Sequence, residues 1–176
     1  MAVKKPDRSA PFPIEMLSVG VAVPFDQALR FEDVYREHGG RLWRSVLLFT
    51  GDREIASDAV AEAFAQAIRR GEEVRSPVGW ITRAAFRIAA GELKARRHSG
   101  GTRREESYEM PEPFSHLAAA LAQLSPNQRA AAVLHYADGY TLAEVAGIIG
   151  STTAAVGVHL FRARARLRQL LGDDHD

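Results

Sequence analysis

Cysteine is absent from this chain, which excludes disulfides, thiolate zinc sites and cysteine nucleophiles together. No uniformly apolar run reaches about 18 residues, so we expect no membrane insertion. No clean apolar segment follows the basic residues near the N-terminus, so we expect no secretory signal and a cytoplasmic location. Neither charge sign is in excess: 23 Lys and Arg stand against 22 Asp and Glu, a net charge of +1. Any argument for nucleic-acid binding therefore depends on where the charges lie.

No alternating pattern typical of β-strands is present either, and the regular patterns in the sequence are helical. Apolar residues at helical spacing predict an all-α chain of two small helical domains, joined by a flexible linker rich in glycine, proline and mixed charge. The proline-containing N-terminal segment shows no sustained period and predicts a flexible extension. The boundaries that we predict are 1–25 for the extension, 26–97 for the first domain, 98–114 for the linker, 115–172 for the second domain and 173–176 for the tail.

The second domain has clear helix-start signals. Ser125 with Gln128, and Thr141 with Glu144, have the spacing of capping boxes. The second box predicts a short helix over 142–149, and a longer helix is expected to start after Ser151 or Thr152 and to run to about residue 171. We expect the following side chains of this domain to face its core: Ala132, Val133, Tyr136, Val156, Leu160, Ala163, Leu167 and Leu171.

The turn between these two helices predicts a helix-turn-helix. Gly150 can close the short helix in a left-handed conformation, and the small side chain of Ala146 allows close packing. Val156 is placed to point back into the angle between the helices. This layout favours DNA binding, while an ordinary helical hairpin is the alternative.

A basic cluster follows on the last helix. It consists of Arg162, Arg164, Arg166 and Arg168, with no acid between Glu144 and Asp173. Such a cluster can neutralise DNA phosphates, although a solvated helix face has the same composition. The six histidines are scattered and none forms an i, i+4 pair, so we expect no metal, no cofactor and no enzymatic activity.

These blocks resemble the two conserved regions of extracytoplasmic-function sigma factors, the small two-domain sigma factors of bacterial RNA polymerase. Residues 31–42 are similar to the opening of the family's first domain, and 58–64 resemble its Asp-x-Val-Gln-Glu-x-Phe signature. The segment that begins at 77–81 resembles the helix that opens and reads the minus-ten element. Residues 124–129 and 163–168 resemble the boundaries of the domain that reads the minus-thirty-five element.

The resemblance implies a non-enzymatic factor that binds core RNA polymerase and directs promoter recognition, DNA melting and transcription initiation. Its implied partners are core RNA polymerase and promoter DNA, and many relatives are also held inactive by an anti-sigma factor. In the family the segment between the domains threads toward the active-site channel, and a plain tether is the alternative here. A polymerase-independent helix-turn-helix regulator is the alternative function, and a helical protein-interaction module is a third class.

The resemblance also implies three sets of contact residues. The contacts to core polymerase are Asp58, Glu62 and Phe64. The contacts to minus-ten DNA are Trp80, Arg83, Phe86 and Arg87. The contacts to minus-thirty-five DNA are Arg129, Thr141, Thr152, Thr153, His159, Arg162, Arg164 and Arg166. Helix solvation is the alternative for the two acids, and core packing is the alternative for Trp80.

The chain departs from the family pattern at several positions. Ala61 replaces the usual glutamine of the polymerase-binding signature. In the helix that begins at 77–81, Arg87 stands where the family often has asparagine, and residues 91–92 are Gly-Glu where the family often has an Asp-Arg pair. The longer helix after Gly150 corresponds to the recognition helix of the family. There the family favours polar or basic side chains, where this chain has Gly, Val and His at residues 157–159. Of these three residues only His159 has a side chain able to bond a base edge. We therefore expect an unusual promoter preference, or a reader that relies more on backbone contacts.

Overall fold

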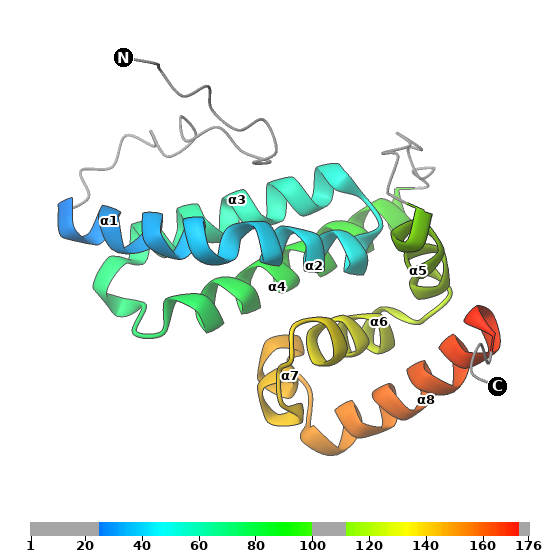
Figure 1. Cartoon of the computed structure of the whole chain (residues 1–176). Helices are drawn as coiled ribbons and strands as arrows, with labels where there is room; N and C mark the ends of the chain where they lie inside the picture. Colours follow the sequence, from blue (N-terminus) through cyan, green and yellow to red (C-terminus); the bar gives the residue numbers. More distant parts are fainter. Residues whose placement is uncertain (1–24, 100–111, 173–176) are drawn as a thin grey trace, which may run out of the picture.

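The computed structural model describes residues 25–99 and 112–172, and every regular element in these ranges is a helix (Figure 1). The first half contains α1 (Phe25–Val34), α2 (Gly40–Thr50), α3 (Arg53–Arg70) and α4 (Pro77–His98). The second half contains α5 (Glu112–Ala122), α6 (Pro126–Ala132), α7 (Leu142–Ile149) and α8 (Thr153–Leu171). The all-α prediction is confirmed, and the predicted extension, linker and tail lie almost entirely outside the described residues.

The helices of the first half start and stop at residues that favour helix ends. Gly51 ends α2 with a φ of 66°, and the Asp52 carboxylate accepts the backbone N–H of Ile55 at 3.0 Å to start α3. Pro77 occupies the first turn of α4, where its missing N–H costs no hydrogen bond, and the Ser76 side chain makes no capping hydrogen bond. A π-helical segment, Tyr35–Gly39, joins α1 to α2 without a break.

Both predicted capping boxes of the second half are present. The Ser125 hydroxyl accepts the N–H of Gln128, whose side chain returns to the N–H of Ser125. At the start of α7 the Thr141 hydroxyl accepts the N–H of Glu144, and the Glu144 carboxylate accepts the N–H of Thr141 at 2.8 Å. These reciprocal bonds satisfy backbone donors that have no partner inside a helix, and they fix where each helix begins.

Two core predictions in the second half are wrong. Tyr136 is 54% exposed, because the chain passes through a π-helical segment, Val133–Ala137, where the wider turn changes which side chains face inward. Leu134 is fully buried in its place. Leu171 is 44% exposed because it is the last residue of α8, at the rim of a shallow groove between α8 and α5.

The two halves pack against each other and share one hydrophobic core. Helix α7 lies on α4, while α5, α6 and the π-helical segment after it contact α2 (Figure 1). The Ser45 hydroxyl of α2 donates to the Asp138 carboxylate at 2.7 Å, and burial raises the pKa of that carboxyl above its usual range. The hydroxyls of Thr82 and Tyr140 lie 3.2 Å apart across the same interface. The sequence pattern did not predict this packing.

Candidate nucleic-acid and protein interfaces

Helices α7 and α8 form a helix-turn-helix. They meet at 99°, within the range typical of this motif, and Gly150 makes the turn with a φ of 67°. Val156 is fully buried and Ala146 is 6% exposed, so both lie inside the angle between the helices as predicted. None of the described helices is by itself long and apolar enough to cross a membrane. Helices α7 and α8 reach that length and composition only as a pair, across this bend.

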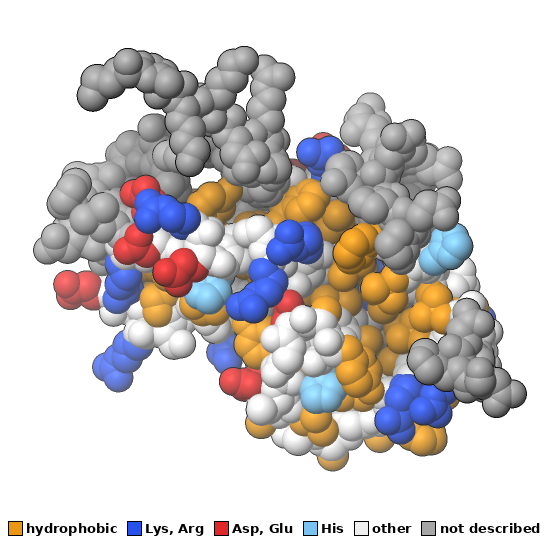
Figure 2. Space-filling model, in the orientation of Figure 1, with side chains coloured by type: hydrophobic (Ala, Val, Ile, Leu, Met, Phe, Trp, Pro, Cys, Tyr) orange, Lys and Arg blue, Asp and Glu red, His pale blue; other side chains and the backbone are white. Residues whose placement is uncertain are grey.

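The basic cluster of α8 lies on the side of the helix that faces solvent. Its four members, Arg162, Arg164, Arg166 and Arg168, are all exposed. The opposite side carries Leu160 and Ala163, which are buried against the rest of the second half. Figure 2 shows basic side chains beside hydrophobic ones in this region, at the lower right. The cluster is therefore accessible to a phosphate backbone.

Three predicted threonines lie at the N-termini of the two helices. Thr141 precedes α7, and Thr152 precedes α8, where its hydroxyl accepts the N–H of Ala155 at 3.1 Å. Thr153 is the first residue of α8, and all three threonines are exposed. The hydrogen bonds from Thr141 lower the pKa of the Glu144 carboxyl. Two of the threonines are therefore N-caps of α7 and α8, and all three side chains are exposed to solvent at the N-termini of these helices.

Two other residues predicted to contact minus-thirty-five DNA point inward. Arg129 is 7% exposed and donates to the backbone carbonyls of Phe49, Ala122 and Leu124 at 3.0, 3.0 and 3.1 Å. His159 is partly buried, and its Nδ1 atom is buried without a hydrogen-bond partner among the described residues. In this arrangement neither side chain is presented with the basic cluster of α8.

The predicted minus-ten residues divide into core and surface. Phe86 is 3% exposed and stacks on Phe49 with 5.2 Å between ring centroids. Trp80 packs partly against the core, and the guanidinium of Arg70 lies 5.6 Å from its ring centroid. Arg83 and Arg87 are exposed one turn apart on α4, and the guanidinium of Arg83 reaches toward Gly147 of α7. The aromatic rings therefore support the helix, and the arginines are the side chains that a ligand can reach.

The predicted polymerase-binding residues divide in the same way. Asp58 and Glu62 are exposed one turn apart on α3. A hydrogen bond from Gln66 and an ion pair with Arg69 at 2.8 Å lower the pKa of Glu62. Phe64 is 3% exposed and meets Tyr35 edge to face, so it is a core residue. The acids form a charged surface that Phe64 supports from inside.

No group of three His, Asp or Glu side chains in residues 25–99 and 112–172 is arranged to hold a metal ion. The features that these residues do offer are an exposed basic helix in a helix-turn-helix and an exposed acidic pair in the other half.

Comparisons with known proteins agree with this arrangement. The family model described as sigma-70, region 4, matches residues 116–167, which lie within α5 to α8. The chain is 26% identical over 156 residues to the RNA polymerase sigma factor CarQ of Myxococcus xanthus, covering 81% of this chain and 90% of that protein. It is 28% identical over 151 residues to the ECF RNA polymerase sigma factor SigM of Mycobacterium tuberculosis, covering 81% and 77%.

A solved structure shares the fold. The sigma factor RpoE from Bartonella quintana, crystallised in complex with the anti-sigma factor NepR, superposes with a TM-score of 0.69 at 21% identity. The match covers 83% of this chain and 99% of that one, so it includes both halves and their all-α architecture.

Proposed function

We infer that this chain is an extracytoplasmic-function sigma factor, which binds core RNA polymerase and directs promoter recognition, DNA melting and transcription initiation. One observation carries the inference: the sigma-70 region 4 match falls on a helix-turn-helix whose outer helix exposes four arginines. The relatives named as sigma factors extend the likeness over about four fifths of the chain, so it includes the first half as well.

In this proposal each half of the chain binds a different part of the polymerase–promoter complex. Residues 26–97 are the domain for core polymerase and the minus-ten element, with the acids of α3 facing the polymerase and Arg83 and Arg87 of α4 facing DNA. Residues 115–172 are the domain for the minus-thirty-five element, with the basic cluster of α8 on the phosphates. The chain acts without enzymatic activity of its own, in the cytoplasm.

An anti-sigma factor is a further partner in this proposal. The sigma factor RpoE, which shares the fold over both halves, was crystallised with such a protein. Core polymerase, promoter DNA and an anti-sigma factor are therefore the three partners to test by co-purification.

Transcription from genomic DNA fragments with purified core polymerase tests the function. We expect run-off transcripts from specific promoters only when the chain and core polymerase are both present, and weak gel shifts with the chain alone. A polymerase-independent regulator would instead shift specific duplexes without polymerase and start no transcript. The relatives, which match over about four fifths of the chain, are named as RNA polymerase sigma factors, and this favours the sigma factor over the alternative.

Replacing Arg164 and Arg166 together by alanine should weaken binding of the holoenzyme to promoter DNA of any sequence. The slope of log affinity against log salt is negative, and each phosphate contact that is lost makes it shallower by about 1. Filter binding over a range of salt concentrations measures this slope. The matched control is Arg36→Ala with Arg44→Ala, which removes the same charge from exposed positions in the first half. An unaltered slope in the α8 variant would mean that the cluster is only a solvated helix face.

A further inference from the structure

One exposed strip of the recognition helix α8 is apolar rather than polar. Val158 is 48% exposed and Phe161 is 68% exposed, the highest value for a large hydrophobic side chain in the described residues. Ala154 and Ala165 are also exposed, and the spacing of i, i+4, i+7 and i+11 puts all four on one line along the helix. We call these four residues the apolar stripe.

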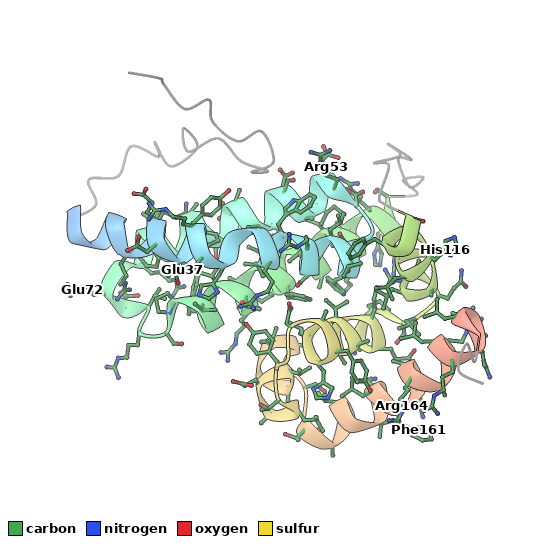
Figure 3. All side chains as sticks on the ribbon, in the orientation of Figure 1. Glu37, Arg53, Glu72, His116, Phe161 and Arg164 are labelled. Atoms are coloured by element: carbon green, nitrogen blue, oxygen red, sulfur yellow. The ribbon has the colours of Figure 1, made fainter. Side chains whose placement is uncertain are left out.

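Arginines border the apolar stripe on both sides. Since each residue advances about 100° around a helix, Arg162 and Arg166 lie along one edge of the stripe and Arg164 and Arg168 along the other. In Figure 3 Phe161 and Arg164 project from the outer side of α8, away from α6. An apolar strip between two rows of cations matches a surface that is anionic at its edges and apolar at its centre.

The first turns of α8 offer few polar side chains for a base edge. Gly157 has no side chain and faces open space, and the Nδ1 atom of His159 is buried. A helix-turn-helix presents the N-terminal turns of its second helix to the bases. Beyond Thr152 and Thr153, the exposed side chains in those turns are therefore those of the apolar stripe.

We propose that the apolar stripe reads the C5-methyl groups of thymines in the major groove of the minus-thirty-five element, with Val158 and Phe161 as specificity-determining residues. Thymine is the base that presents an apolar group in that groove, and the phosphate strands on either side supply the anionic edges. This assignment rests on the proposed function, which places α8 on promoter DNA. It replaces polar base contacts by burial of a methyl group, which gains affinity only where thymine is present.

The charges around the apolar stripe favour duplex DNA as its binding partner. Four arginines surround the stripe, and no acid lies between Glu144 and Asp173. An apolar docking site for a protein has no need of cations along both edges, whereas a DNA groove has phosphates along both edges.

Deoxyuracil substitution tests the proposal directly. Uracil pairs as thymine does and lacks only the methyl group. Run-off transcription first identifies a promoter, and each thymine of its minus-thirty-five element is then replaced in turn by deoxyuracil. We expect the holoenzyme to bind about fourfold more weakly for each methyl group that the stripe buries. With Phe161→Ala or Val158→Ala in the holoenzyme, the thymine and uracil promoters should bind equally at the position that the residue reads.

The matched control is Arg164→Ala, which removes a cation beside the stripe. It should weaken binding to thymine and uracil promoters alike and keep the difference between them. Thermal unfolding of each variant checks that these exposed substitutions leave the fold intact.

Several outcomes would overturn the proposal. Equal binding of thymine and uracil promoters at every position would overturn it, while continued promoter-specific transcription would leave the sigma-factor assignment standing. A Phe161→Ala variant that binds DNA normally but loses an anti-sigma factor would assign the stripe to a protein instead. A chain that starts no transcription with core polymerase would overturn the proposed function and this inference with it.

Discussion

Reversing Asp58 and Glu62 to arginine should abolish binding of the chain to core RNA polymerase and leave its fold intact. Both side chains are exposed on α3, one turn apart, so the change replaces two acids by two bases on one surface without touching the core. Like charges brought together at an interface cost several kcal/mol, which corresponds to an affinity loss of about 100-fold or more. The lost ion pair between Glu62 and Arg69 is a surface pair and costs about 1 kcal/mol of stability at most.

Co-purification and titration calorimetry with purified core polymerase measure this effect. The control variant is Glu72→Arg with Glu73→Arg, which makes the same charge change on exposed residues after the end of α3 (Figure 3). We expect the control to bind core polymerase normally. If the α3 variant also binds normally, the polymerase contact lies on another surface.

Replacing Arg129 by methionine should destabilise the whole chain. The guanidinium donates to three backbone carbonyls, one in α2 and two near the end of α5, and methionine has similar length but no donor. Leaving buried carbonyls without partners costs about 1 to 3 kcal/mol each, so we expect a loss of about 3 kcal/mol or more in the free energy of unfolding.

Urea unfolding without DNA measures this loss as a lower midpoint. Arg129→Lys keeps the positive charge but lacks the planar fork of donors, so it should recover only part of the stability. A loss below about 1 kcal/mol in the methionine variant would contradict the role of Arg129 as a bond between the two halves.

The helix boundaries could be predicted because their causes are local. The capping residues Thr141 and Glu144 and the left-handed Gly150 act within a few residues of the helix ends, and the structure has all three as expected. The exposure of Tyr136 could not be predicted, because a π-helical turn changes the helical period and leaves no clear mark in the sequence.

The sequence predicted only part of the candidate site, because it did not show which of the contact residues are exposed. The arginines of α8 were predicted to lie apart from the buried side chains of Val156, Leu160 and Ala163, and the structure exposes all four. Phe64 and Phe86 lie in motifs that resemble contact sites, yet a motif does not reveal whether an aromatic ring faces a partner or the core, and both rings are buried. The inward position of Arg129 depends on a carbonyl 80 residues away in the chain, at Phe49, which no local pattern encodes.

On the proposed function, the packing of α7 on α4 opposes simultaneous binding of the two promoter elements. The minus-ten and minus-thirty-five elements lie about 25 base pairs apart, which at 3.4 Å per base pair is about 85 Å. A compact chain of this length has a radius of gyration of about 16 Å and is about 40 Å across. If each half holds one element as proposed, the two halves must separate before both elements can be held at once, and the bonds of Arg129 to Phe49 and of Ser45 to Asp138 must break or be replaced.

That requirement lowers the apparent affinity of the free chain for a promoter by the fraction of molecules that are open. Core polymerase, by holding the halves apart, would raise that fraction and the affinity together. On the proposed function, the interface between the halves therefore makes promoter binding depend on polymerase.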